Sequence, residues 1–269
     1  MKNFLRFGYL QALSCIFPAI IFAALAFSKF VEIPFLPRYD FILLVCIAAQ
    51  FFMLASKLET LDELKVICIF HVIGLALELY KVHMGSWAYP EPAHSKFFGV
   101  PLYSGFMYAS VASYICQAWR HMDLKVYEWP KPFFTVAISC LIYANFFTHH
   151  FTYDIRWILK VLLFMIFFRT FVTFQVSSRI YKMPLILSFL LIGFFIWIAE
   201  NITTFLGAWQ YPDQQVAWSL VHIGKISSWF LLVIISVIIV AQLKRVKSSM
   251  KYQEKEPTSL PVAIRNTYK

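Results

Sequence analysis

The sequence predicts an all-α membrane protein, a bundle of eight transmembrane helices built as two parallel four-helix repeats. The 269-residue chain is 60% hydrophobic and only 14% charged, whereas soluble domains average about 25% charged residues. Apolar runs long enough to cross about 30 Å of hydrocarbon recur along its whole length. The hydrophobic composition leaves no room for a sizeable soluble domain. A rare motif that begins with Glu also occurs twice.

Each apolar run is expected to form one span. The spans are expected at residues 7–28, 41–56, 64–82, 99–118, 132–150, 156–175, 184–205 and 216–242. The first resembles a secretory signal peptide, because Lys2 and Arg6 precede it and Ala24-Leu25-Ala26 resembles a cleavage site. Its apolar stretch is longer than the roughly 7–15 residues usual in such peptides, so we expect the span to be retained.

The repeated motif divides these spans into two halves. The copies are Glu78 with Gly85-Ser86-Trp87-Ala88-Tyr89-Pro90, and Glu200 with Gly207-Ala208-Trp209-Gln210-Tyr211-Pro212. The offset of 122 residues also superimposes the first span on the fifth and the third on the seventh. It therefore predicts repeats at 1–122 and 123–245. Each repeat has an even number of spans, so both enter the membrane from the same side and are parallel.

Basic residues predict the orientation. They are concentrated on the N-terminal side of the spans and in the tail 246–269, which is expected to be a disordered, basic cytoplasmic extension. Because positive residues mark the cytoplasmic side, both termini are expected inside and both motif loops outside. The net charge of +10 thus serves topology rather than nucleic-acid binding. The expected partners are membrane lipids, and the sequence leaves the oligomeric state open.

The duplicated carboxylate is the strongest functional signal, because a Glu in an apolar span is costly and marks a site. Glu78 and Glu200 are expected one to two turns below the outer surface. His71 shares a helix face with Glu78, and His222 and Lys225 begin the last span. Further polar residues at this depth are Asn145, Thr148, His149, His150, Asp154 and Lys160. We expect one cavity open to the outer face, in which the carboxylates exchange protons and His or Lys assist.

The predicted site has two parts. The catalytic residues are expected to be Glu78, Glu200, His71, His222 and Lys225. The substrate-binding residues are expected to be Trp87, Tyr89, Trp209, Tyr211 and Asn201. Three imidazoles and an Asp could bind zinc, but no span contains H-E-x-x-H or H-x-x-x-H. We therefore predict no metal and no cofactor.

Two structural alternatives stay open. The Trp-x-Tyr-Pro loops could be interfacial anchors, since Trp and Tyr favour the headgroup level. The two Glu could instead hold the halves together, ion-paired with Lys225 or Lys160. Away from this region, the acidic cluster of Glu59, Asp62 and Glu63 is expected to be a solvated cytoplasmic loop.

A family resemblance is carried by the segment from His71 and Glu78 through the first motif copy to Gly99-Val100-Pro101-Leu102. The whole chain resembles an uncharacterised family of bacterial integral membrane proteins, a domain of unknown function typified by YoaT. This resemblance implies the bacterial cytoplasmic (inner) membrane and transfers no activity. More distantly, the chain is similar to small membrane lycopene cyclases and carotenoid hydratases, which have a Gly-x-Trp-x-Tyr-type loop. In the cyclases a paired-carboxylate motif follows the proline, whereas Leu102-Tyr103-Ser104 follow Pro101.

Three functions fit these expectations. The first is an intramembrane enzyme that uses Glu78 and Glu200 for acid–base chemistry on a polyisoprenoid or other lipid from the outer leaflet, as the carotenoid-enzyme similarity implies. The second is a small transporter or channel whose halves line a pathway. The third is a non-catalytic structural membrane protein. A transporter needs polar residues through both leaflets, and the inner halves of the spans offer few, which favours a one-sided site.

Overall fold

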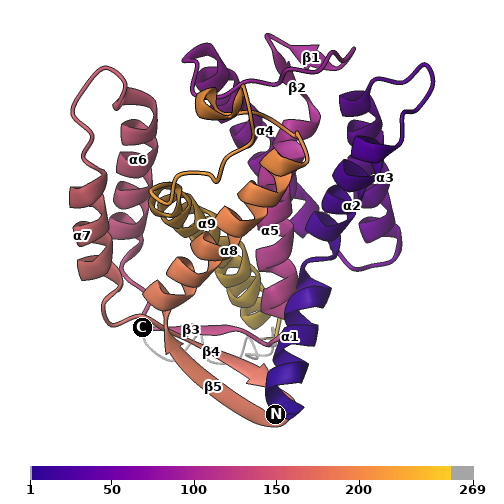
Figure 1. Cartoon of the computed structure of the whole chain (residues 1–269). Helices are drawn as coiled ribbons and strands as arrows, with labels where there is room; N and C mark the ends of the chain where they lie inside the picture. Colours follow the sequence, from indigo (N-terminus) through magenta and orange to yellow (C-terminus); the bar gives the residue numbers. More distant parts are fainter. Residues whose placement is uncertain (1, 256–269) are drawn as a thin grey trace, which may run out of the picture.

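Helices dominate the computed structural model, which describes residues 2–255 (Figure 1). The helices are α1 Lys2–Ser14, α2 Ile16–Phe30, α3 Arg38–Ala55, α4 Leu61–His83, α5 Tyr103–His121, α6 Pro132–Thr148, α7 Arg156–Phe167, α8 Leu185–Phe205 and α9 Lys225–Lys255. The strands are β1 Lys96–Phe97, β2 Val100–Pro101, β3 Lys125–Tyr127, β4 Phe171–Val176 and β5 Arg179–Pro184. The fold is therefore mostly helical, as predicted, but it is not all-α.

Helices capable of crossing a membrane are present in the described part of the chain. α3, α4 and α8 are long and apolar enough, and α1 with α2 would count as a fourth if this bent pair is one span. The pair bends by 68°, at the break between Ser14 and Ile16. α6 and the Lys225–Ala241 part of α9 are apolar but shorter. Length and composition thus support apolar membrane helices, whereas the number of eight spans stays a prediction.

The predicted span 156–175 is wrong in its last eight residues. α7 ends at Phe167, and the chain continues as a strand over Phe171–Val176. This segment is rich in aromatic and β-branched side chains, which fit a pleated surface. A two-residue turn at Ser177, whose φ is +55°, returns the chain into β5. The hairpin therefore replaces the end of the span.

The predicted span 216–242 begins too early. α9 starts at Lys225. Residues 216–224 are not helical, and side chains of other segments hydrogen-bond to their backbone. Asn201 Oδ1 accepts a hydrogen bond of 2.9 Å from the Val221 backbone. At its other end α9 continues to Lys255, ten residues into the tail that was expected to be disordered. Residues 256–269 of that tail lie outside the described residues.

A three-stranded antiparallel sheet of β3, β4 and β5 lies at the end of the bundle where α1 begins (Figure 1). α1 packs on this sheet, with the ring of Phe7 5.6 Å from that of Phe174. Asn3 also donates a 3.1 Å hydrogen bond to the Tyr181 hydroxyl. The β1–β2 hairpin lies at the opposite end, next to the loop that follows α4.

The helices pack as two close pairs, α4 with α5 and α8 with α9. One apolar core lies among α4 to α9, and a second lies among α2, α3, the start of α5 and the two motif loops. Gly74 permits the close approach of α4 and α5, because a Cβ at this position would lie only 2.5 Å from the ring of Tyr108. This approach brings the Tyr108 hydroxyl to Glu78 on α4.

Candidate functional site

The two copies of the motif fold in the same way at the ends of α4 and α8. Gly85 has φ +69° and Gly207 has φ +77°, a region that favours glycine. In the first copy Gly85 N donates to Val82 O and Ser86 N donates to Lys81 O, the two bonds of a Schellman helix end. The second copy has the same two bonds at the same relative positions. Each glycine therefore turns its loop back over the last turns of its helix, which explains the fixed spacing from Glu.

The two motif loops also pair with each other. Ala88 N donates to Gln210 O at 2.9 Å, and Gln210 N donates to Ala88 O at 2.9 Å, so that these residues form an antiparallel bridge. They are 122 residues apart and occupy the same position in the two copies. The bridge therefore holds the ends of α4 and α8 side by side.

Glu78 is buried, with 3% of its surface exposed, and it accepts three hydrogen bonds from aromatic side chains. Its Oε2 accepts from Trp87 Nε1 at 2.7 Å and from the Tyr89 hydroxyl at 2.7 Å. Its Oε1 accepts from the Tyr108 hydroxyl of α5 at 2.8 Å. A buried carboxylate needs such donors, because burial removes its hydration.

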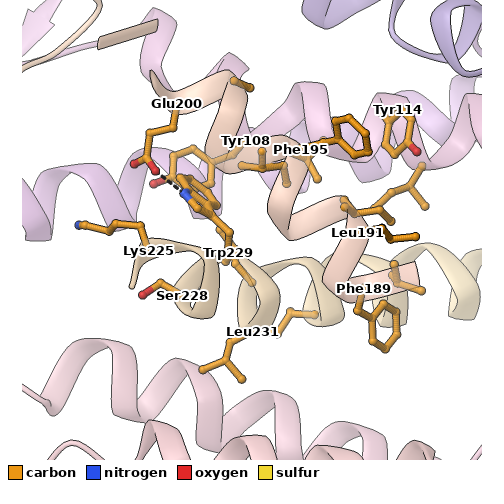
Figure 2. Close-up of a pocket in the computed structure, with 18 of the residues that line it drawn as sticks. Tyr108, Tyr114, Phe189, Leu191, Phe195, Glu200, Lys225, Ser228, Trp229 and Leu231 are labelled. Atoms are coloured by element: carbon orange, nitrogen blue, oxygen red, sulfur yellow. Dashed lines mark hydrogen bonds between the residues drawn. The ribbon is translucent and has the colours of Figure 1, made fainter. Parts of the chain in front are cut away.

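Glu200 is equally buried and has a similar set of donors. The Tyr211 hydroxyl donates to its Oε1. Trp229 Nε1 of α9 donates to its Oε2 at 2.6 Å, as Figure 2 shows. In both copies, then, one donor is the tyrosine eleven residues after the Glu and another is an aromatic residue on the next helix. Among the described side chains, neither carboxylate has a Lys, Arg or His within ion-pair distance.

Lys225 at the start of α9 lies between the two halves of the site. Its Nζ is 4.4 Å from the ring centre of Tyr211 and 5.4 Å from that of Trp87, distances typical of cation–π contacts. The rings of Trp87 and Tyr211 touch edge to face, with 6.0 Å between their centres. The two motif copies therefore build one continuous aromatic shell around one lysine.

A long cleft of about 1400 Å³ leads to this shell. It extends from α1 between α5, α8 and α9, and Figure 2 shows Phe189, Leu191 and Leu231 along it, away from Glu200 and Lys225. The central lining is mainly apolar. The polar end of the cleft is defined by Glu78, Lys81, Asp154, Arg156, Glu200 and Lys225, together with the adjacent His149 and His150.

The loop between α6 and α7 supplies the outer wall of this polar end. Asp154 accepts hydrogen bonds from Arg156 Nε at 2.6 Å and from Asn145 Nδ2 at 3.3 Å. Burial alone would raise the pKa of Asp154, but the bonds from Arg156 and Asn145 outweigh it and lower the pKa to about 2. Burial and the nearby Lys81 lower the pKa of His149. The wall thus contains a charged ion pair beside a neutral imidazole.

The structure brings together only part of the predicted site. Of the predicted catalytic residues, Glu78, Glu200, Lys225 and the exposed His222 line the cleft. Of the predicted substrate-binding residues, Trp87, Trp209 and Tyr211 line it.

His71, Tyr89 and Asn201 do not line the cleft. The ring of His71 packs on Phe106 at 4.5 Å, and its buried Nδ1 has no hydrogen-bond partner. Tyr89 is buried behind Glu78. Asn201 holds the backbone before α9, with Oδ1 on Val221 N.

Several cleft residues were missed from the sequence. Tyr108 and Trp229 are the donors from α5 and α9, and Lys81 and Arg156 were not among the predicted site residues. One signal could have found the aromatic pair: Tyr108 follows Glu78 by 30 residues, and Trp229 follows Glu200 by 29. No comparable signal marks the cations, because their place depends on the packing of α4 against the α6–α7 loop.

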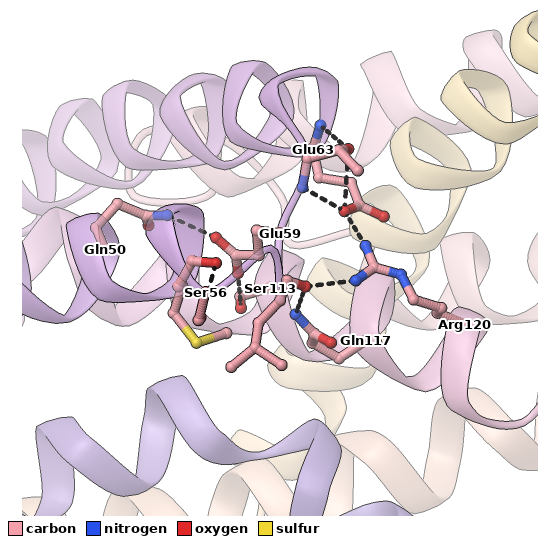
Figure 3. Close-up of polar contacts among 10 residues, drawn as sticks. Gln50, Ser56, Glu59, Glu63, Ser113, Gln117 and Arg120 are labelled. Carbon is pink, nitrogen blue, oxygen red and sulfur yellow. Dashed lines mark hydrogen bonds and ion pairs between the residues drawn. The ribbon is translucent and has the colours of Figure 1, made fainter.

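The acidic cluster near the start of α4 is not a solvated loop, in contrast to the prediction. Glu59 and Glu63 are 3% and 2% exposed. Gln50 Nε2 donates to Glu59 at 2.6 Å, Ser113 also donates to Glu59, and Arg120 of α5 pairs with Glu63 (Figure 3). Burial raises the pKa of Glu59, which the bonds from Ser113 and Gln50 oppose. The cluster ties the α3–α4 turn to α5, at the end of α4 opposite to Glu78.

Comparisons with known proteins place the chain in a family. The family described as "Protein of unknown function (DUF817)" matches residues 3–237. The chain is 62% identical to "Uncharacterized protein YoaT" of Bacillus subtilis (strain 168) over 247 residues, which cover 92% of this chain and 94% of that protein. No solved structure matches significantly. Neither match tests the similarity to carotenoid enzymes, which stays a prediction. The resemblance to the YoaT-like family is confirmed, and the chain belongs to the DUF817 family of proteins of unknown function.

Proposed function

We propose that this protein is an intramembrane enzyme that binds a lipid in the central cleft and moves protons to and from it at Glu78 and Glu200. The observation that carries the proposal is the shape and chemistry of the cleft. Its apolar length suits a hydrocarbon chain, and its single polar end contains both duplicated carboxylates. A site with an apolar body and a few convergent polar groups is typical of small-molecule binding.

The placement in the membrane is part of the proposal. A multi-pass protein of the bacterial inner membrane, with both termini in the cytoplasm, would put the motif loops and the polar end of the cleft toward the outer leaflet. α4 and α8 both end at the paired motif loops and so run in the same direction. The Ala88–Gln210 bridge joins equivalent positions. Both features favour two parallel repeats, 1–122 and 123–245.

The proposed chemistry depends on two tyrosines that line the cleft. Tyr108 donates to Glu78 and Tyr211 donates to Glu200, and both belong to the cleft wall. A phenol bonded to a carboxylate can pass its proton to that carboxylate while it accepts a proton from a bound substrate. Each Glu–Tyr pair can therefore serve as a general base, and in the reverse direction as a general acid.

A transporter or channel is the second candidate, because the cleft lining extends from the α6–α7 loop to Phe4 at the start of α1. A pathway for ions or polar solutes would need polar groups along this length. Gln11 and Ser110 are among the few polar side chains there. The apolar middle therefore favours a lipid over a polar solute.

A deletion strain tests the enzymatic function. We expect its membrane lipid extract, measured by mass spectrometry, to accumulate one lipid that the wild-type gene removes. Glu78→Gln and Glu200→Gln should fail to restore the pattern although their thermal unfolding stays near that of the wild type. Glu32→Gln, which changes an exposed carboxylate, is the control and should restore it. Full restoration by both buried-site variants would overturn the acid–base role.

A further inference from the structure

We propose that the polar end of the cleft binds a phosphate-type anion, so that the ligand is an amphiphile with a phosphate or pyrophosphate headgroup and an apolar chain. This inference rests on the proposed lipid-binding cleft and names its ligand class. The headgroup would lie among Lys81, Arg156, Lys160 and Lys225, with His149 and His150 beside it. The chain would follow the apolar length of the cleft toward α1.

The first observation is a buried ammonium group without a carboxylate. Lys81 is 4% exposed. Its Nζ lies 3.0 Å from His150 Nε2 and 3.5 Å from His149 Nε2, and 4.3 Å from the ring centre of Phe146. Among the described residues, no Asp or Glu oxygen lies within 4.0 Å of this nitrogen. A buried cation is costly unless an anion offsets it, so Lys81 is prepared for a negatively charged ligand.

The second observation is that further cations line the same polar end of the cleft as Lys81. The positive charges of Lys225 and Arg156 are near enough to repel the ammonium of Lys81, and the carboxylate of Asp154 attracts it. Asp154 is already engaged by Arg156, whose Nη2 lies 2.5 Å from it. Lys160 adds a fourth cation, stacked on Trp157. These side chains come from α4, α7 and α9 and converge on one end of the cleft, which single surface lysines would not do.

The third observation is the state of the two imidazoles. His149 Nδ1 lies 3.1 Å from the carbonyl oxygen of Asn145 and 3.0 Å from that of Phe146. Nδ1 therefore carries a proton that it donates to these carbonyls, and Nε2 is left as an acceptor facing Lys81. An arriving anion would draw the ammonium of Lys81 toward itself and favour protonation of Nε2. Nε2 of His149 can thus change from an acceptor to a donor as the anion binds, and Nε2 of His150 lies on the same side, 3.0 Å from Lys81 Nζ.

The number of converging donors favours phosphate over carboxylate. A phosphate monoester carries about −1.5 to −2 charges at pH 7 and three acceptor oxygens, which Lys, Arg and His side chains recognise together. A fatty-acid carboxylate carries one charge and would leave two of the three lysines without a partner, since Arg156 already pairs with Asp154. Glu78 and Glu200 attract Lys225 from a distance, but among the described side chains neither forms an ion pair within 4.0 Å with these cations, and both are hydrogen-bonded by Trp and Tyr side chains.

The test measures the binding of matched probes to the full-length protein in non-ionic detergent, with the change in tryptophan fluorescence as the readout. The probes are farnesyl phosphate, farnesol, farnesoic acid and inorganic phosphate. We expect farnesyl phosphate to bind at least about tenfold more tightly than farnesol or farnesoic acid, and inorganic phosphate to bind more weakly than farnesyl phosphate. Lys81→Gln should lower the affinity for farnesyl phosphate by about tenfold, as the loss of one charge-assisted bond predicts. The affinity for farnesol should not change.

Controls separate this inference from the proposed function. Lys65→Gln removes an exposed lysine of the same helix and should change no affinity. If Lys81→Gln does not fold, Lys160→Gln should still lower the affinity for farnesyl phosphate and leave that for farnesol unchanged.

Equal affinity for farnesol and farnesyl phosphate would overturn the anion site and leave the lipid cleft standing. Equal affinity for farnesoic acid would overturn the preference for phosphate. Tight binding of inorganic phosphate would indicate a free-anion site and overturn the amphiphile. Binding of no probe would overturn the lipid cleft as well.

Discussion

At the scale of single residues, the two motif carboxylates are not interchangeable. Glu78 accepts three hydrogen bonds, and Glu200 accepts two. The third donor to Glu78 is Trp87, whereas its counterpart Trp209 is not one of the two donors to Glu200. Loss of one donor therefore leaves Glu78 with two partners and Glu200 with one.

This difference predicts unequal effects of two matched substitutions. Tyr211→Phe should lower the free energy of unfolding by about 1–3 kcal/mol, because a buried carboxylate oxygen loses its only donor. Tyr89→Phe should cost less, because Trp87 still donates to the same oxygen of Glu78. Thermal unfolding of the purified protein measures both, with Tyr153→Phe as the control, since Tyr153 is 93% exposed. Equal losses at both positions would contradict the inequality of the two sites.

The lowered pKa of Asp154 predicts that the stability of the protein depends on pH in the acidic range. Its pKa is lowered from an ordinary value of 3.8 to about 2, as Arg156 and Asn145 outweigh the effect of burial. A folded-state pKa below the unfolded one contributes stability that is present above 3.8 and is lost as the pH falls toward 2. The wild type should therefore lose more stability than Asp154→Asn over this window. Unfolding temperatures of both proteins across the acidic range provide the measurement, and parallel curves would exclude the contribution.

At the scale of elements, the Schellman ends of α4 and α8 fix the site, because they return each motif loop to its Glu. Gly207→Ala should destabilise the protein by about 1 kcal/mol or more, since φ is +77° and the added Cβ would lie 3.3 Å from Arg38 Nη1. Gly85→Ala should cost less, because its Cβ would meet no atom within 4 Å and only the φ of +69° is unfavourable. Gly8→Ala in α1 is the control and should be neutral or stabilising. A neutral Gly207→Ala would contradict this account of the loop.

The elements that the sequence predicted well are those whose apolar runs have the length of a helix. α4, α6 and α8 begin and end within three residues of their predicted spans. β4 was missed because no Gly or Pro separates it from the apolar run of α7, so that its aromatic and β-branched residues were counted as the end of the same helix. The burial of Glu59 was missed because Ser113 and Gln50, which bind it, lie on other helices. Such tertiary partners leave no periodic signal in a single sequence.

At the scale of the whole molecule, the repeat located the carboxylates but not their surroundings. Glu78 and Glu200 could be found because the motif marks them twice. Lys81 could not, because the α6–α7 loop that faces it is distant in sequence. His71 was included because it shares a helix face with Glu78, but seven residues along α4 carry it out of the cleft to Phe106. Helical spacing predicts which side of α4 a side chain is on, whereas the extent of a cavity depends on every helix that borders it.

Orientation is the prediction that belongs to this scale. A reporter active only outside the cytoplasm should be active when inserted in the loop at 91–96, which lies at the end of the bundle with the motif loops. The same reporter fused after residue 250 should be silent, because the excess of basic residues places this end of the chain inside. Enzymatic assay of the two fusions, with expression levels matched by immunoblot, is the measurement. The opposite pattern would invert the proposed topology and move the cleft mouth to the cytoplasmic leaflet.

If the two halves are tandem repeats, as proposed, the Ala88–Gln210 bridge has a consequence for their ancestry. Its two hydrogen bonds are reciprocal, as in an isologous contact between identical subunits. A half-length ancestor carrying one such loop would have been able to pair with its own copy and form a homodimer with two identical carboxylates. Fusion of the two genes would then have released each copy from the symmetry of the other. Trp229 where the first half has Tyr108, and Lys225 in contact with aromatic rings of both halves, are differences that two separate sequences can acquire and a single self-pairing sequence cannot.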